Sequence, residues 1–214
     1  GHIPSDSRAV AAGTVASLGM VVFGLTAHSS FPAFSLALAG LLLTSVAVAG
    51  SFLRGHSPAQ TFGLTGITRP VAAGCIAGIL LGAGLAVLFR VTYDQPLLLT
   101  GIRPFVLTAA LIGAAEELLF RGFIQGKLSS LGWPAAVVLA SLAHTAYKLS
   151  LFVFPKEGWA TSFFILGSFT FVVGCMQGAL RQGTGSVIPP VTAHALFDIL
   201  AYGDWAQAPW WVWG

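Results

Sequence analysis

The sequence predicts an all-α polytopic membrane protein, a bundle of about seven transmembrane helices. Of its 214 residues, 56% are hydrophobic and only 8% are charged, and the mean hydropathy is +0.85. These values lie far from those of soluble domains. The chain also divides into apolar runs of about 20 residues, the length that a helix needs to cross roughly 30 Å of hydrocarbon. These runs cover residues 9–28, 31–53, 71–90, 105–125, 135–154, 161–180 and 187–203.

The first run, residues 9–28, is too long for a secretory signal and is not followed by a soluble domain, so we expect it to remain as a helix. The longest polar connection, residues 54–70, lies between the second and third runs. We therefore predict an N-terminal two-helix part, residues 1–53, and a core, residues 54–214, within one continuous membrane domain.

The C-terminal segment, residues 205–214, reads WAQAPWWVWG and is rich in tryptophan. It is too short to span a bilayer. Indole rings favour the headgroup region, where the ring is buried and the N–H stays hydrated. This segment is therefore expected to lie at the membrane interface.

The net charge of +3 comes from ten Lys and Arg that form no basic stripe, which argues against a nucleic-acid partner. The lipid bilayer is the expected partner. The positive-inside rule favours a cytoplasmic N-terminus, because that side would then carry the larger share of cations: Arg8, Arg54, Arg69, Arg121, Lys127 and Arg181. The absence of asparagine and the abundance of Ala, Gly and Leu point to a prokaryotic inner membrane.

The fourth run contains three charged residues, Glu116, Glu117 and Arg121, in the sequence IGAAEELLFRG. A charge at the bilayer centre costs a few kcal/mol or more, so such residues usually face partners or trapped water. On a helix, Glu117 and Arg121 share a face and can form an ion pair, while Glu116 lies about 100° away. We expect the pair to have a supporting role and Glu116 to face the bundle interior.

Two later runs carry further ionisable residues at a similar depth. His144 lies near the middle of the fifth run, and His194 and Asp198 lie one turn apart in the seventh. At about 1.5 Å per residue, Glu116, His144, His194 and Asp198 lie roughly 10 to 16 Å from the same membrane surface. Lys148, one turn after His144, is expected to snorkel toward the nearer membrane surface.

A carboxylate beside an imidazole can take a proton from water as the water attacks a carbonyl carbon, so hydrolysis is the predicted reaction. Glu116 and His144 are the candidate water-activating pair. His194, with its tautomer set by Asp198, is the candidate donor to the oxyanion. The alternative is a divalent metal such as zinc held by Glu116, His144, His194 and Asp198. Because no HExxH motif occurs, we favour a site without metal or other cofactor.

The motifs also resemble those of a known family. EELLFRG at 116–122, LASLAH at 139–144 and HALFD at 194–198 are similar to EExxxR, FxxxH and HxxxN or HxxxD of the CAAX protease and bacteriocin-processing (CPBP, Abi) family. FGLTGITRP at 62–70 resembles the segment before that family's core, so the resemblance covers about 62–202. One position departs from the pattern, since Ala140 replaces the phenylalanine of FxxxH.

The resemblance implies an α-helical intramembrane endopeptidase of the type II CAAX prenyl endopeptidase kind. Glu116 and His144 would activate water, His194 and Asp198 would support the tetrahedral intermediate, and Glu117 and Arg121 would assist. The implied substrate is a membrane-associated peptide or lipidated protein, prenylated or carrying a leader.

Two other functions fit some of the same features. A proton- or ion-coupled transporter would also place acids and histidines within the membrane, although the sequence shows no inverted repeat. A non-catalytic immunity or scaffold protein of the same family would retain the core without the reaction. The sequence does not distinguish among peptide substrates, since specificity would lie in the apolar walls of a cavity.

Overall fold

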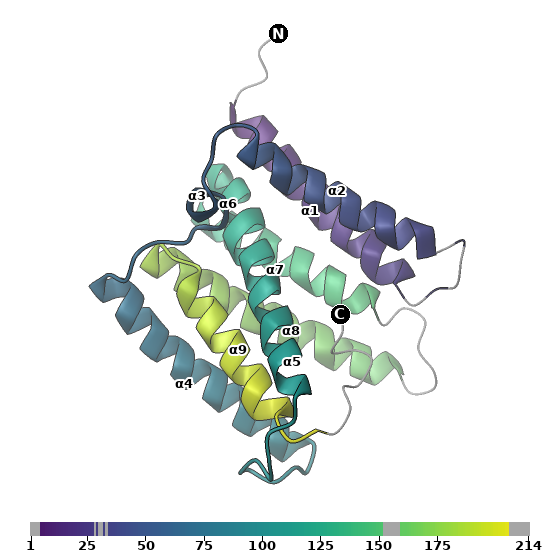
Figure 1. The fold of residues 1–214 in the computed structure, drawn as a ribbon, viewed down its shortest axis with the longest axis vertical. Helices are drawn as coiled ribbons and strands as arrows, with labels where there is room; N and C mark the ends of the chain where they lie inside the picture. Colours follow the sequence, from purple (N-terminus) through teal and green to yellow (C-terminus); the bar gives the residue numbers. More distant parts are fainter. Residues whose placement is uncertain (1–4, 28, 30–31, 33, 152–158, 206–214) are drawn as a thin grey trace.

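The computed structural model describes residues 5–27, 29, 32, 34–151 and 159–205. Within these ranges the fold is entirely helical (Figure 1). The long helices are α1 (Ser5–Thr26), α2 (Phe34–Phe52), α4 (Arg69–Thr92), α5 (Phe105–Glu117), α7 (Trp133–Ser150), α8 (Trp159–Thr184) and α9 (Ile188–Tyr202). The shorter elements are α3 (Pro58–Phe62), the π-helix η1 (Leu118–Ile124), α6 (Gln125–Leu128) and the 3₁₀ turn η2 (Ser129–Leu131).

Among the residues that the structure describes, each predicted apolar run lies on a long helix, which η1 continues in the fourth run, so the all-α prediction is confirmed for them. Within the described part of the chain, four helices are long and apolar enough to cross a membrane: Ser7–Thr26, Phe34–Phe52, Arg69–Thr92 and Phe163–Thr184. The chain is an integral membrane protein. Helices α5, α7 and α9 are not among these four, so their crossing of the membrane stays a prediction. Helix α9, for example, has 15 residues and covers only about 22 Å. Of the predicted C-terminal interfacial segment, all but Trp205 lies outside the described residues.

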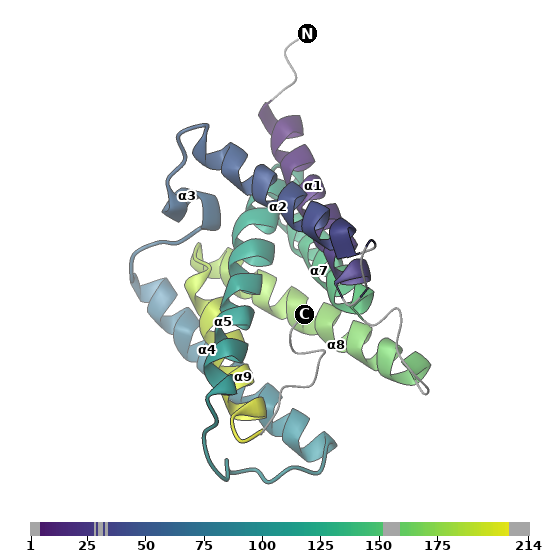
Figure 2. The same cartoon turned by 45° about the vertical axis from the view of Figure 1, so that its right-hand side comes forward.

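Helices α1 and α2 form an antiparallel pair that packs on the rest of the bundle through α7 (Figures 1 and 2). The two helix backbones approach closely at Gly19 and Gly40. A Cβ atom built at Gly19 would lie only 2.5 Å from the carbonyl oxygen of Gly40. Small residues allow two helix backbones to approach in this way. Against α7, the Phe23 ring of α1 stacks on Tyr147 with centroids 6.4 Å apart. The N-terminal helices thus support the helix that carries His144.

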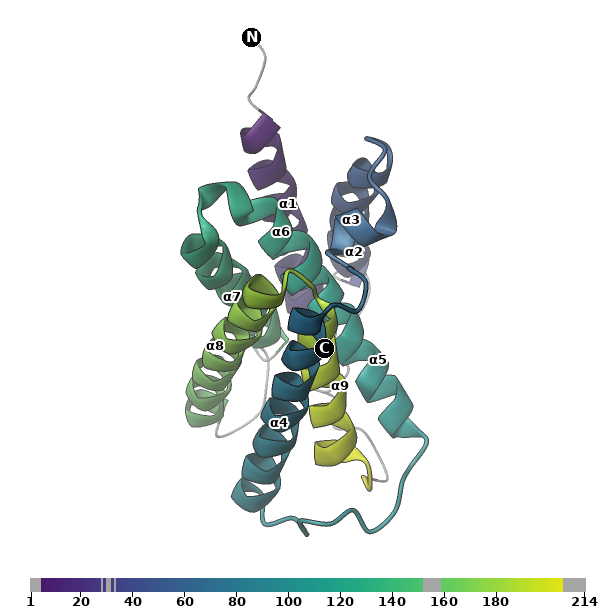
Figure 3. The ribbon, with the colours of Figure 1, turned by 90° about the vertical axis from the view of Figure 1, so that its left-hand side faces the viewer.

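Helix α9 lies between α4 and α5 (Figure 3). A glycine stripe on α4, Gly74, Gly78 and Gly82, receives Pro189 and Ala193 of α9. A Cβ atom at Gly78 would lie 2.7 Å from the Pro189 carbonyl oxygen, so any side chain there would separate the helices. This close packing fixes α9, and with it His194 and Asp198, against the core.

The helix after the Glu116–Glu117 pair widens into the π-helix η1. The apolar run over residues 105–125 predicted one ordinary helix through this stretch. Short π segments occur often at functional sites, where they change the direction of side chains. Here the short helix α3 packs on η1, since a Cβ atom at Gly122 would lie 3.1 Å from the Phe62 carbonyl carbon. A capping box between Ser57 and Gln60 begins α3.

An ion pair ties the C-terminal ends of α4 and α9 together. Arg90 Nη2 lies 2.8 Å from Asp204 Oδ2; Arg90 is buried and Asp204 is partly buried. Arg90 also donates to the carbonyl oxygens of Leu200 and Ala201 at the end of α9. Asp204 accepts from the backbone N–H of Thr100, in the loop between α4 and α5. This cluster fixes α4, α9 and the connecting loop relative to one another.

Candidate active site

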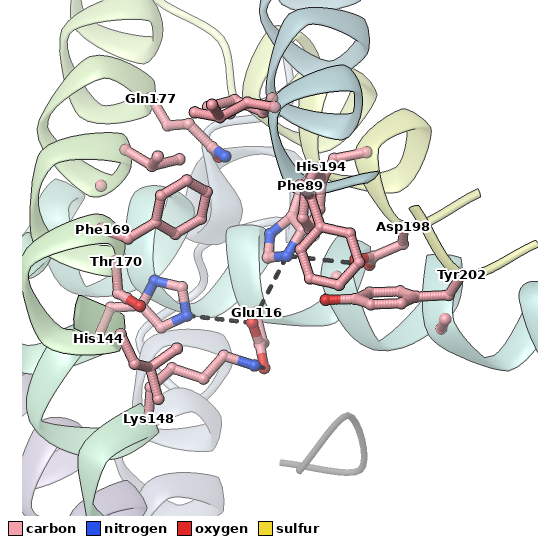
Figure 4. A pocket seen from close by; sticks show the side chains of 18 of the residues that line it. Phe89, Glu116, His144, Lys148, Phe169, Thr170, Gln177, His194, Asp198 and Tyr202 are labelled. Carbon is pink, nitrogen blue, oxygen red and sulfur yellow. Dashed lines mark hydrogen bonds and ion pairs between the residues drawn. The ribbon is translucent and has the colours of Figure 1, made fainter. Parts of the chain in front are cut away.

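Glu116 lies at the centre of a buried polar cluster (Figure 4). Its Oε2 atom lies 3.0 Å from His144 Nε2 and 3.9 Å from His194 Nε2. Its other oxygen, Oε1, lies 2.6 Å from Lys148 Nζ. Helices α5, α7 and α9 therefore direct a carboxylate, two imidazoles and an ammonium group toward one point.

The second nitrogen of His144 identifies the tautomer of this ring. His144 Nδ1 lies 2.6 Å from Arg121 Nη1. A guanidinium group has only donors, so Nδ1 must accept, and the ring proton is carried by Nε2. The Nε2–H group then donates to Glu116. In this arrangement His144 donates to the carboxylate, and Glu116 rather than His144 is the candidate base.

Glu117 supports the other imidazole. Its Oε1 atom accepts from His194 Nδ1 at 2.8 Å, and its Oε2 atom pairs with Arg121 Nε at 3.3 Å. The amide group of Gln177 on α8 lies against this carboxylate, so its nitrogen is assigned to that side, where it donates to both oxygens at 2.7 and 2.8 Å. The predicted Glu117–Arg121 pair is confirmed. The expectation that Asp198 sets the His194 tautomer is wrong, because Glu117 reaches inward and bonds Nδ1 instead.

Asp198 faces the opposite side of the same ring. Its Oδ2 atom lies 3.9 Å from His194 Nε2, beyond a direct hydrogen bond. The Asp198 side chain lies against Gly113 of α5. A Cβ atom built at Gly113 would overlap the carboxylate and lie 2.9 Å from the His194 ring. A glycine is therefore required opposite the two functional residues of α9.

An aromatic ring packs on His144 although the motif phenylalanine is replaced by Ala140. Phe120 of η1 stacks on the imidazole with ring centroids 4.5 Å apart and an interplanar angle of 24°. Ala140 is fully buried in the same apolar cluster, together with Phe123 and Tyr147. The neighbourhood of His144 thus remains tightly packed without an aromatic residue at position 140.

A cavity of about 580 Å³ adjoins the cluster. Its polar wall includes Glu116, Arg121, His144, Lys148, Gln177, His194 and Asp198. The remaining walls are mainly apolar, with Leu85, Leu88 and Phe89 from α4 and Ile165, Leu166 and Phe169 from α8. Tyr202 and Asp198 line the α9 side (Figure 4). The arrangement can expose an apolar chain to a carboxylate and two imidazoles, as the hydrolysis hypothesis requires.

The residues do not fit a metal ion in this arrangement. Among the described residues no group of three or more His, Cys, Asp and Glu side chains is placed to hold one. Glu116 and His144 bond each other directly, and the cations Lys148 and Arg121 each lie 2.6 Å from one of them. A further positive ion would have to displace these contacts.

The structure brings together all four residues proposed from sequence for the reaction, Glu116, His144, His194 and Asp198. Sequence reasoning missed two neighbours. Lys148 does not snorkel as expected but turns inward to Glu116. Its position one turn after His144 was the available signal, since residues at i and i+4 share a helix face. For Gln177 the only signal in the sequence was a polar residue inside the apolar run 161–180.

Taken together, the fold and the cluster define a helical membrane protein with a buried acid–imidazole site beside an apolar cavity. Residues 96–200 match the family model described as Rce1-like, type II CAAX prenyl endopeptidase Rce1-like. The match includes all three motifs, so the resemblance that they show is confirmed over this part of the chain. No curated protein and no solved structure matches the chain. The family match supports the assignment of the chain as a membrane peptidase.

Proposed function

We propose that the protein is an intramembrane endopeptidase that hydrolyses a peptide bond of a membrane-associated substrate, by means of a water molecule activated by Glu116 and His144. The observation that carries this proposal is the 3.0 Å contact between His144 Nε2 and Glu116 Oε2 at the wall of the cavity. A general base must lie within hydrogen-bond reach of the proton that it removes. Glu116 lines the cavity, so a water molecule bound against it would lie within that reach.

The reaction proceeds in two proton transfers. Glu116 takes a proton from water while the water oxygen forms a bond to the carbonyl carbon, and the carbonyl oxygen becomes an oxyanion. The proton then passes from Glu116 to the peptide nitrogen as the C–N bond breaks, which yields a carboxylic acid and an amine. The base is regenerated, so the cycle needs no oxidant, reductant or bound metal.

His194 is the proposed donor to the oxyanion. Because Glu117 accepts from Nδ1, the Nε2 atom can donate only when the ring carries both protons. Glu116, Glu117 and Asp198 surround this ring, and their negative charges balance an imidazolium. Asp198, beside Nε2, would hold the ring in this orientation during the reaction.

The proposed substrate class is a peptide with an apolar or lipidated segment. The apolar walls formed by α4 and α8 lie beside the polar cluster, so a chain that carries a prenyl group or a hydrophobic leader would be desolvated there. The family description, CAAX prenyl endopeptidase, favours the prenylated form.

The direct test uses the Glu116→Gln variant, which keeps the shape of the side chain but removes the base. Purified protein in nanodiscs would be given prenylated, unprenylated and leader-type fluorogenic peptides. We expect the wild type to cleave a prenylated or leader-type peptide, and Glu116→Gln to lose at least about 100-fold in kcat. Asp94→Asn makes the same chemical change at an exposed loop position and is expected to retain activity.

Two results would overturn the proposal. One is full activity of a folded Glu116→Gln protein. The other is a wild type that cleaves none of the peptides, which would favour a non-catalytic or transport function for the same cluster.

A further inference from the structure

Lys148 is the least expected member of the cluster. It lies in a helix that is otherwise mostly apolar, yet its ammonium group turns inward and lies 2.6 Å from Glu116 Oε1. Its side chain is 17% exposed and lines the cavity (Figure 4). A lysine near a membrane surface normally extends toward water. An inward orientation therefore needs a compensating interaction, and Glu116 supplies it.

Helix α7 holds Glu116 at two points. His144 and Lys148 are one turn apart on the same face, and each contacts a different oxygen of the carboxylate. A carboxylate held by one oxygen can rotate about its terminal bond, whereas one held by both cannot. Oε2 is thereby kept on the side of His194, 3.9 Å from its Nε2 atom.

Lys148 also supplies the positive charge that pairs with Glu116. Three buried carboxylates, Glu116, Glu117 and Asp198, surround the His194 ring. Arg121 pairs with Glu117, whereas Glu116 pairs with Lys148. His144 is a neutral donor in the tautomer fixed by Arg121. Without Lys148, the proposed base would lose the cation that contacts its Oε1 atom. A buried carboxylate with less compensating positive charge takes up a proton more readily.

We propose that Lys148 is a positioning residue of the site, which holds Glu116 ionised and oriented toward the reacting water. This inference rests on the proposed peptidase function. Lys148 acts through Glu116 and is not assigned a contact with the substrate.

The kinetic test compares Lys148→Met, which removes the charge, with Lys148→Arg, which keeps it. Lys127→Met is the matched control, because the Lys127 ammonium lies over the Phe123 ring, away from the cluster. We expect Lys148→Met to lower kcat about 10- to 100-fold with little change in KM. The acidic limb of its pH–rate profile should move to higher pH, because a base without its cation is protonated more readily. Lys148→Arg should keep most of the activity and the profile of the wild type.

The proposal is overturned if Lys148→Met matches Lys127→Met in kcat and in its pH profile. It is also overturned if Lys148→Met and Lys148→Arg lose equal activity with unchanged profiles, since that result indicates packing alone.

A second measurement does not depend on activity and guards against poor folding of one variant. Thermal unfolding of the wild type, Lys148→Gln, Glu116→Gln and the double variant forms a double-mutant cycle. We expect the effects of the two substitutions to be non-additive, because each removes the partner of the other. Additive effects would overturn the pairing. If no peptide is cleaved but the cycle shows coupling, the peptidase proposal fails while the ion pair stands.

Discussion

Arg121 donates to Nδ1 of His144 across 2.6 Å, from the π-helix η1 to α7. This contact places the single ring proton on Nε2, the atom that faces Glu116. The arginine of the EExxxR motif thus does more than pair with Glu117, because it also determines which way His144 donates.

The Arg121–His144 contact predicts a catalytic cost for a conservative change. Arg121→Lys keeps the charge but has no planar fork to bond Glu117 and His144 together. We expect kcat/KM to fall about 10- to 100-fold, a typical cost for groups that orient others in a site. Nitrogen NMR of the labelled histidines should show that His144 no longer has one fixed tautomer. Unchanged kinetics with an unchanged His144 spectrum would contradict this role.

The close fit at Gly113 predicts that a methyl group there disrupts the site. In Gly113→Ala the added Cβ meets the Asp198 carboxylate and the His194 ring, so these side chains must move. A misplacement of about 1 Å can reduce activity about 100-fold. Gly84→Ala is the control, since nothing lies within 4 Å of a Cβ at that helical position. Kinetics and thermal unfolding should show an inactive but folded Gly113→Ala and an active Gly84→Ala. Equal activity of the two variants would refute the predicted displacement.

Activity should not depend on a bound metal. Glu116 and His144 bond each other, and Lys148 and Arg121 supply positive charge beside them, so the proposed steps need no metal ion. Dialysis against a chelator, followed by metal analysis and a peptidase assay, should change the rate less than about twofold. Loss of activity that zinc restores would favour the alternative in which Glu116, His144, His194 and Asp198 are ligands.

The Arg90–Asp204 pair predicts a pH-dependent contribution to stability. Hydrogen bonding from the Arg90 guanidinium lowers the pKa of Asp204 from 3.8 to about 2, and the Thr100 N–H adds to this effect, although partial burial opposes it. A carboxyl with a lower pKa in the folded state stabilises the fold above its unfolded pKa of about 4. That contribution is lost as the pH falls through about 2.

Asp204→Asn tests this contribution. Since the substitution leaves the Arg90 charge buried without its partner, it should cost roughly 3 kcal/mol of unfolding free energy at neutral pH. The difference in thermal stability from the wild type should narrow as the pH falls from 4 toward 2. Asp94→Asn, on the exposed loop, should show no such difference. A gap between wild type and Asp204→Asn that is constant with pH would contradict the assignment.

Local sequence patterns determined much of this molecule. Apolar runs predicted the seven long helices, because burial of apolar side chains in lipid and hydrogen bonding within a helix both depend on contiguous residues. The i, i+4 spacing also predicted the Glu117–Arg121 pair. Depth along the helices selected Glu116, His144, His194 and Asp198, since equal distance from one membrane surface brings residues of different helices to one layer.

The tertiary structure alone decided how these groups are paired. Which carboxylate faces which imidazole depends on helix rotation, and the π-helix η1 and the glycine stripe of α4 set that rotation through contacts between distant residues. For this reason Glu117, rather than Asp198, bonds His194 Nδ1, and Lys148 turns inward to Glu116. Spacing within one helix fixes which residues share a face, but only packing between helices fixes what that face meets.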